Sequence, residues 1–434
     1  MLRTHHNNEL RKDHIDQTVT LTGWVNNRRD HGGIIFVDLR DSYGITQIVF
    51  DPSHGPDAHK RAERVRSEWV IQVTGKVRHR GDELENPRLD TGAIELIVEK
   101  IEILNEASTP PFEVDHDSEI REDLRLEYRY LDLRKPRMQK NLKLRHQMTK
   151  TIRDYFDTNE FLEVETPIMV KGTPEGSREY LVPSRLHRGE FYVLPQSPQQ
   201  YKQLLMTSGM ERYFQFARCM RDEDLRGDRQ PEFTQLDMEM SFATEEDIMN
   251  LNEALLIEIV TKLYPKKRIQ QIPFPRIPYA EGMEKYGNDR PDIREDKEDE
   301  NLLAFCWVVD FPFFEKTAES DDPQAQGEWT FTHNPFSLSK PEHVDSLKNK
   351  ENVGDIIAAQ YDIVLNGFEI GGGSVRAHDP EVLRSILQIL GHTEEAIEEN
   401  FGHMLTALGS GTPPHGGIAW GFDRLVMILQ NEKT

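Results

Sequence analysis

Two alternating segments joined by a short polar loop constrain the fold of this chain more than any other feature. Residues 212–223 read RYFQFARCMRDE and residues 232–240 read EFTQLDMEM. Because side chains alternate between the two faces of a strand, the pair predicts an antiparallel hairpin with one apolar face. The other face carries a mixed polar set: Arg221, Glu223, Phe233, Gln235, Asp237 and Glu239. A ring for stacking and a guanidinium for phosphate favour a nucleotide site there, while a solvated, ion-paired face fits the pattern equally well.

The first hundred residues predict a small β-barrel. Five segments either alternate between apolar and polar residues or are continuously apolar, and Gly or Asp turns separate them. They are 19–28, 33–40, 45–51, 69–80 and 93–104. A helical stretch, 57–69, follows the third. This layout is typical of the OB barrel, which often holds single-stranded nucleic acid. Phe36 and Gln47 would lie on neighbouring strands and contact a base, unless Phe36 belongs to the core of a barrel without a ligand.

A second hairpin is predicted at Asn366-Gly367, within YDIVLNGFEIGGGSVR (361–376). Asn-Gly is the strongest short-range signal for a two-residue hairpin turn. Such a turn pairs Val364 with Glu369 and brings Asp362 to the same side as Glu369, about 7–8 Å away. Two carboxylates at that spacing suit Mg²⁺ when phosphates supply further ligands.

Two arginines add to these hairpins. HGGIAWGFDRLVMIL (415–429) predicts a glycine-rich strand turning into a helix, with Arg424 in the first helical turn. The helix dipole disfavours a cation there, so Arg424 suggests an anionic partner, with a tolerated surface arginine as the alternative. Arg376 falls on the face opposite Glu369 unless the glycines 371–373 form a bulge.

The rest of the chain predicts an α+β protein with two domains and a linker. Residues 105–120 are Pro-rich, acidic and non-periodic, which indicates an interdomain connection. Residues 138–161 have helical apolar spacing, and 163–170 predict a strand broken by Pro167. We therefore expect a barrel domain at 1–104, a linker at 105–137 and a second domain at 138–434.

Composition excludes several classes of protein. The chain has no 18-residue apolar run and its first residues contain no apolar signal core, so neither a membrane partner nor secretion is expected. Two distant cysteines, Cys219 and Cys306, give no disulfide framework and no metal-ligand spacing. A cytoplasmic location follows. The net charge is −23, but residues 1–104 hold 15 basic and 17 acidic residues, which leaves basic patches possible there.

The hairpins and the glycine strand together resemble the three signature motifs of class II aminoacyl-tRNA synthetases. The first motif corresponds to FLEVETPIM (161–169), the second to 218–239 and the third to the strand that ends in GFDR (421–424). QSPQQYKQLLM (196–206), GTPEGSREY (172–180) and GFEIGGGSVR (367–376) resemble the aspartyl-tRNA synthetases of bacterial type. The resemblance implies an anticodon-binding OB barrel, a catalytic domain with a mostly antiparallel sheet flanked by helices, and a homodimer that meets near Pro167.

The resemblance also implies a set of residue roles. Those that bind ATP are Arg221, Glu223, Phe233, Gln235, Glu369 and Arg424, with Arg221, Arg424 and Glu369 assisting catalysis. Those that bind L-aspartate are Glu175, Gln199, Lys202, Asp237, His333 and Arg376, with Ser197 shaping the pocket. Those that contact tRNA are Arg29, His31, Phe36, Gln47, Gly81, Arg226 and Arg229. Asp362 and Glu369 are expected to hold Mg²⁺.

The implied reaction is aspartate–tRNA ligation. ATP converts L-aspartate into aspartyl-adenylate, and the 3′ end of tRNA(Asp) then takes the aspartyl group. Lys202 and Arg376 would select a charged side-chain carboxylate over neutral asparagine.

The chain departs from the family in three places. An inserted domain usual in bacterial-type members is missing near 289–301, and the chain ends at Thr434, before the usual C-terminal extension. His333 is followed by Asn334 where the family often has a second histidine. His31 and Gly81 match members that also charge tRNA(Asn). The alternatives are therefore such a non-discriminating enzyme, a synthetase for asparagine or lysine, or a catalytically impaired tRNA-binding relative or minimal core.

Overall fold

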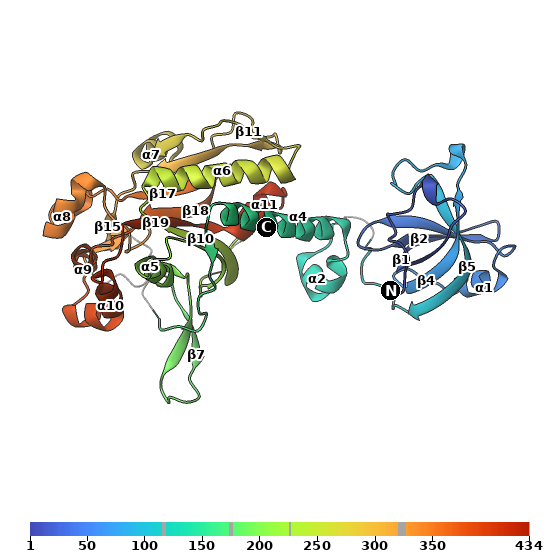
Figure 1. Cartoon of the computed structure of the whole chain (residues 1–434), viewed down its shortest axis with the longest axis horizontal. Helices are drawn as coiled ribbons and strands as arrows, with labels where there is room; N and C mark the ends of the chain where they lie inside the picture. Colours follow the sequence, from blue (N-terminus) through green and yellow to red (C-terminus); the bar gives the residue numbers. More distant parts are fainter. Residues whose placement is uncertain (115–118, 173–176, 225–226, 320–326, 434) are drawn as a thin grey trace. The chain divides into compact units, whose positions relative to one another are not determined.

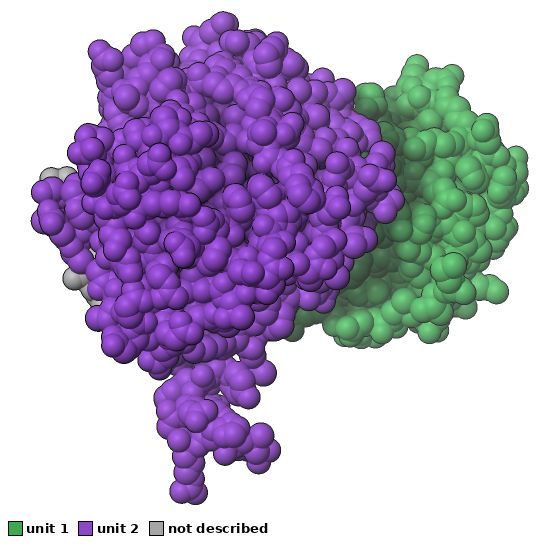
Figure 2. Space-filling view, turned by 60° about the vertical axis from the view of Figure 1, so that its left-hand side comes forward, with its two compact units in different colours: residues 1–143 green, residues 144–434 purple. Residues whose placement is uncertain are grey.

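The computed structural model describes residues 1–114, 119–172, 177–224, 227–319 and 327–433, and the chain divides into two compact units. Unit 1 spans Met1–Lys143 and unit 2 spans Leu144–Thr434 (Figure 2). The division falls inside helix α4 (Pro136–Thr158). Residues 106–114 of the expected linker form neither helix nor strand. The boundaries of a separate linker at 105–137 stay a prediction.

Unit 1 contains the predicted OB barrel. Its strands close in the order β1-β2-β3-β5-β4. Their bounds are β1 Thr18–His31, β2 Ile34–Arg40, β3 Ile45–Phe50, β4 Val70–His79 and β5 Ile94–Asn105. Among the described residues of the unit, the α-helices before α4 are α1 Pro56–Ala62, α2 Glu122–Glu127 and α3 Arg129–Asp132. Alternate residues of β1, among them Val19, Leu21 and Val25, enter the apolar core. Helix α1 is shorter than the predicted 57–69.

Unit 2 is built on an eight-stranded, mostly antiparallel sheet, as predicted. The strand order is β12-β14-β17-β18-β19-β10-β9-β6, with parallel pairing only at the two outer pairs, β12–β14 and β6–β9. The bounds are β12 Arg276–Pro278, β14 Phe305–Val309, β17 Gln360–Leu365, β18 Phe368–Val375, β19 His415–Gly421, β10 Glu232–Ser241, β9 Arg212–Met220 and β6 Leu162–Glu163.

Helices cover this sheet on both faces. Their bounds are α5 Gln199–Thr207, α6 Glu245–Leu263, α7 Tyr279–Tyr286, α8 Val344–Asn349, α9 Pro380–Ile389, α10 Glu394–Leu408 and α11 Phe422–Leu429. Apolar residues of α4, α6 and α11 pack against one face in the largest core cluster. In Figure 1, α6 lies above the central strands and α5 below them. Thr244 caps α6 by accepting a hydrogen bond from the Asp247 backbone N–H.

The described residues of unit 2 also form three two-stranded sheets. They pair β11 (Arg268–Ile269) with β13 (Leu302–Leu303), β15 (Phe314–Lys316) with β16 (Trp329–Phe331), and β7 (Tyr180–Pro183) with β8 (Phe191–Leu194). The β7–β8 hairpin extends away from the sheet (Figure 1). Among the described residues, no helix is long and apolar enough to cross a membrane.

The strand predicted at 163–170 is wrong for most of its length. Only Leu162 and Glu163 pair with β9, and Val170 makes a single bridge with Val193. Pro167 lies between these contacts and has no N–H to donate to a ladder. Ile168 and Met169 beside it are more than half exposed.

Candidate active site

A cleft in unit 2 brings together most of the residues singled out in its sequence. It is lined from the β9–β10 hairpin, α5, the β17–β18 hairpin and the junction of β19 with α11. The predicted residues on its wall are Ser197, Gln199, Lys202, Arg221, Glu223, Arg229, Phe233, Gln235, Asp237, His333, Glu369, Arg376 and Arg424. Glu175 and Arg226 lie outside the described residues.

The β9–β10 hairpin has the faces that alternation predicts. Phe233 pairs with Cys219 and Asp237 with Gln215, so these residues share one face of the hairpin. Leu236 and Met238 point the other way, into the core beneath α4 and α6. Cys219 and Cys306 are both buried. The polar face of the hairpin therefore forms the floor of the cleft.

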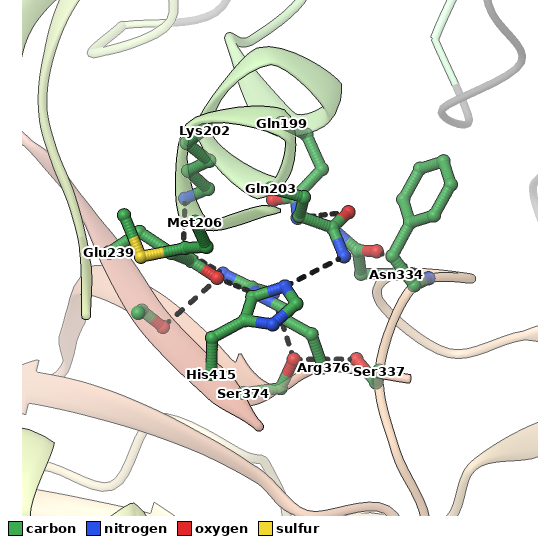
Figure 3. A network of polar contacts seen from close by, with 12 residues as sticks. Gln199, Lys202, Gln203, Met206, Glu239, Asn334, Ser337, Ser374, Arg376 and His415 are labelled. Carbon is green, nitrogen blue, oxygen red and sulfur yellow. Dashed lines mark hydrogen bonds and ion pairs between the residues drawn. The ribbon is translucent and has the colours of Figure 1, made fainter. Parts of the chain in front are cut away.

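Four buried charged residues pair with one another at the site, and Figure 3 shows three of them, Lys202, Glu239 and Arg376. The Lys202 Nζ lies 3.1 Å from Asp237 Oδ2 and 3.2 Å from Glu239 Oε2. Arg376 donates to Glu239 through two nitrogens, Nε at 2.9 Å and Nη2 at 3.2 Å. None of the four residues is more than 3 % exposed. Buried charges persist only when they are paired and hydrogen-bonded, and Glu239 bridges the two cations here.

The expected residue roles did not include Glu239. Alternation placed it on the polar face of the hairpin, but only the folded structure brings it to Lys202 and Arg376. Burial opposes its ionisation, yet Arg376 and Lys202 lower the pKa of Glu239 to about 2. Glu239 is therefore ionised at neutral pH and holds both cations in place.

Asp237 is the least satisfied member of this group. Its Oδ2 accepts from Lys202, but its Oδ1 is buried and has no hydrogen-bond partner among the described residues. Burial raises the pKa of Asp237 to about 6. A buried acceptor without a donor is costly to the folded state and suits a ligand that brings a positive charge.

Replacing Asp237 by asparagine is expected to stabilise the protein in a pH-dependent way. Because its folded pKa exceeds the unfolded value of 3.8, the wild type loses stability as pH rises from about 4 through 6. The loss is on the order of 3 kcal/mol, and Asp237→Asn escapes it. Urea unfolding at pH 4 to 8 measures the difference between the two proteins. A difference that stays constant across this range would contradict the expectation.

The β17–β18 hairpin turns at Asn366-Gly367, as predicted, with φ of 51° and 85°. Val364 pairs with Glu369, and a register shift then leaves Ile370 as an extra residue before Gly371 pairs with Ile363. This bulge moves Arg376 onto the face that carries Glu369. Arg376 therefore shares a face with Glu369, as expected if this part of the strand forms a bulge.

Asp362 and Glu369 converge over Gly372. A Cβ built on Gly372 would lie 2.9 Å from Asp362 Oδ1 and 3.8 Å from Glu369 Oε1. Burial, and then the charge of Asp362, raise the pKa of Glu369. Two carboxylates that repel each other over a glycine form a donor set that suits Mg²⁺.

His333 lies against this carboxylate pair. Its Nε2 is 3.4 Å from Asp362 Oδ2, and its ring packs edge-on against Phe311. Burial disfavours the imidazolium, but Asp362 and then Glu369 raise the pKa of His333 to about 9. The two carboxylates therefore favour the charged form of His333.

Arg221 and Arg424 both line the cleft. The Arg221 guanidinium lies over the Phe233 ring, 5.2 Å from its centroid. Arg424 is in the first turn of α11, as predicted, and its Nε donates to Asp228 Oδ2 at 2.6 Å. Arg221 therefore contacts the ring expected to stack on adenine, and Arg424 lines the same cleft.

The remaining predicted residues of the hairpin are held by neighbours. Glu223 accepts from Ser177 Oγ at 2.6 Å and lies 3.9 Å from Arg229. Gln235 Oε1 accepts from the Cys219 thiol at 3.2 Å. Arg229 is exposed at the edge of the cleft.

Four of the predicted tRNA-contacting residues of unit 1, Arg29, His31, Phe36 and Gln47, lie on strands β1 to β3, and Gly81 follows β4. Phe36 is half-buried and lies outside the barrel core, so the core alternative for Phe36 is wrong. Arg29 pairs in register with Phe36 and donates to Asp38 at 2.9 Å and to Gln47 at 3.2 Å. Gln47 in turn donates to Glu95 at 2.7 Å, so both ends of its amide are occupied. His31 is exposed at the end of β1.

Gly81 adopts a φ of +93°, a conformation that few other residues tolerate. Nothing lies within 4 Å of the position where its Cβ would be.

Two parts of the chain match two known families. Residues 121–434 match the family described as tRNA synthetases class II (D, K and N), and residues 19–104 match the OB-fold nucleic acid binding domain. A curated protein of Desulfatibacillum aliphaticivorans, an aspartate–tRNA(Asp/Asn) ligase, is 39% identical over 100% of this chain and 92% of its own length. An aspartate–tRNA ligase of Bacillus licheniformis is 39% identical over 98% of this chain and 92% of its own length. The first alignment spans 558 positions, so that relative has residues without a counterpart in these 434.

Solved structures share the fold. Asparaginyl-tRNA synthetase from Pyrococcus horikoshii, complexed with asparaginyl-adenylate, has a TM-score of 0.77 at 23% identity and covers 99% of this chain and 96% of its own. A putative aspartyl-tRNA synthetase from Leishmania major Friedlin has a TM-score of 0.77 at 19% identity over 100% and 92%.

Proposed function

We propose a mechanism for a chain that belongs to the class II tRNA synthetases of the D, K and N group and that acts, like its curated relatives, as an aspartate–tRNA ligase. The observation that carries the proposal is the pair of cations in the deepest part of the cleft. Lys202 and Arg376 lie on either side of Glu239, and both line the cleft. Two fixed cations favour a ligand with a charged side-chain carboxylate over its neutral amide.

We assign the substrate ammonium group to the acidic residue Asp237 in the same cleft. Asp237 Oδ1 is a buried acceptor without a donor among the described residues, and Gln199 adds an amide to the same cleft. An ammonium group satisfies Asp237 and removes the cost of its burial. The α-carboxylate of L-aspartate is then left to face the ATP site.

The first step is attack of an α-carboxylate oxygen on the α-phosphorus of ATP. The new O–P bond forms aspartyl-adenylate, and the bond to the β-phosphate oxygen breaks to release pyrophosphate. Arg221 binds the α-phosphate and Arg424 the γ-phosphate, while Phe233 stacks on adenine. These groups act by positioning and by offsetting charge at phosphorus.

Asp362 and Glu369 would hold Mg²⁺, because their carboxylates converge over Gly372. When bound, the ion supplies neutralisation of phosphate charge.

In the second step the 3′-terminal hydroxyl of tRNA(Asp) attacks the aspartyl carbonyl carbon, and AMP leaves. Arg226 and Arg229 are proposed to meet the acceptor end, and Arg29, His31, Phe36, Gln47 and Gly81 the anticodon. We propose charging of tRNA(Asn) as a second activity. His31 and Gly81 favour it, and several relatives at 39–40% identity are aspartate–tRNA(Asp/Asn) ligases.

We further propose a cytoplasmic homodimer. Leu162, Ile168 and Met169 expose 56%, 53% and 55% of their surface around Pro167, an apolar area that a second copy would cover.

Aspartate-dependent ATP–pyrophosphate exchange, followed by charging of purified tRNA(Asp) and tRNA(Asn), tests the proposal. We expect exchange with L-aspartate and Mg²⁺, and charging of both tRNAs. Charging of tRNA(Asp) alone would remove the second activity. Absence of exchange in folded protein would contradict the adenylate step.

A further inference from the structure

A chain of three polar side chains runs from the cleft into the interior of unit 2 (Figure 3). Gln199 and Gln203 lie one turn apart on α5, and His415 begins β19. Gln199 Nε2 is 3.1 Å from Gln203 Oε1, and Gln203 Nε2 is 3.3 Å from His415 Nε2. Gln203 and His415 are fully buried, while Gln199 borders the cleft. Neither Gln203 nor His415 has a role in the proposed function.

The direction of this chain follows from its inner end. His415 Nδ1 lies 2.8 Å from the Pro413 carbonyl oxygen, which can only accept, so the imidazole proton is on Nδ1. Burial lowers the pKa of His415, which keeps the ring neutral. Its Nε2 is then an acceptor, and Gln203 must donate its amide N–H to it.

The same polarity continues to the cleft. Because the Gln203 nitrogen faces His415, its Oε1 faces Gln199 and accepts from the Gln199 amide nitrogen. That leaves Gln199 Oε1, which has no hydrogen-bond partner among the described residues. Turning Gln199 over would oppose its carbonyl oxygen to that of Gln203.

We infer that His415 and Gln203 are positioning residues that set the polarity of the Gln199 amide, so that its carbonyl oxygen is presented to the α-ammonium group of the bound amino acid. The inference rests on the proposed function, which places L-aspartate in the cleft. An amide turned the other way would direct its NH₂ group at the ammonium. The hydrogen-bonded side chains of Gln199, Gln203 and His415, called the relay below, therefore favour a ligand with a free α-amino group.

Calorimetric titration with L-aspartate and with succinate tests the relay. Succinate has the same two carboxylates but no ammonium group. The variants are Gln203→Leu, His415→Asn and His415→Gln. The amide of glutamine reaches the place of histidine Nε2, whereas that of asparagine reaches only the place of Nδ1. Gln200→Leu is the matched control, since Gln200 is a buried glutamine of α5 that accepts from another histidine, His403, at 2.8 Å.

Gln203→Leu and His415→Asn are expected to weaken L-aspartate binding by about tenfold or more, because a hydrogen bond to a charged group loses its orientation. Succinate affinity should stay the same in both. His415→Gln and Gln200→Leu should bind both ligands like the wild type. Thermal unfolding of each variant confirms that it is folded.

Two results would overturn the inference. The first is an equal loss of affinity for L-aspartate and for succinate, which would mean that the hydrogen bonds of Gln203 and His415 only support the fold. The second is a His415→Asn variant that binds better than His415→Gln, which would mean that the contact with Pro413 is what matters. If the wild type binds L-aspartate without catalysing exchange, the proposed function fails while the relay is still decided. If it does not bind L-aspartate, both fail.

Discussion

Replacing Glu239 by alanine is expected to lower the free energy of unfolding by about 3–5 kcal/mol, because it removes one member of a buried ion network and leaves its partners in place. Lys202 would still be paired with Asp237, whose Oδ1 has no hydrogen-bond partner among the described residues. Arg376 would lose both of its bonds to a carboxylate and keep those to Ser374 and to the Gly417 carbonyl. A fully buried guanidinium without a counter-charge is the dominant cost.

Urea unfolding at pH 7 measures this loss, and Glu232→Ala is the matched control. Glu232 is in the same strand, β10, and also pairs with an arginine, Arg218, but both side chains are more than half exposed. Exposed pairs contribute at most about 1 kcal/mol, so the control should unfold almost like the wild type. Similar losses in the two variants would mean that Glu239 does not stabilise the site through burial.

The faces of the two hairpins were predictable because they depend on local rules. Strand alternation placed Phe233 and Asp237 together, and the Asn366-Gly367 turn set the pairing of Glu369 with Val364. These rules need only a few neighbouring residues. The functional roles assigned to those faces came from the resemblance to a family and stay proposals.

The role of Glu239 was out of reach of the same reasoning. Its partners Lys202 and Arg376 are 37 positions before it and 137 after it, and pairing at such distances depends on the assembled sheet. The sequence signal was present, since Glu239 continues the polar face of β10 into a part of the strand where both neighbours in sequence are apolar. A charge that the fold buries requires a buried partner of opposite sign.

Irregular backbone limited the prediction in two further places. The bulge at Ile370 reverses the face of every later residue of β18, and three glycines suggested a bulge without placing it. The strand predicted at 163–170 stops at Glu163, because Pro167 interrupts the ladder. In both cases one residue decides the orientation of several others, so periodicity alone does not find it.

The Arg221→Ala variant is expected to lower the rate of aspartate-dependent pyrophosphate exchange by about 10²–10³-fold, the usual effect of removing one fixed donor from a developing charge. The Arg221 Nε is buried and has no hydrogen-bond partner among the described residues. Its guanidinium rests on Phe233, the ring proposed to stack on adenine. Because this cation contributes little to the stability of the fold, the free energy of unfolding should fall by only about 0.5–1 kcal/mol.

The separation of rate from stability is what identifies Arg221 as catalytic. Arg218→Ala is the control, because Arg218 is three residues away on the same hairpin and binds Glu232 on its exposed side. We expect the control to keep its exchange rate, and Arg221→Lys, which restores charge without the planar fork, to recover only part of the lost rate. An Arg221→Ala variant that retains more than a tenth of the wild-type rate would show that another group holds the α-phosphate. A rate loss matched by an equal loss of folded protein would place Arg221 among the residues that maintain the hairpin, and the phosphate would then have to be held by another cation of the cleft, such as Arg424.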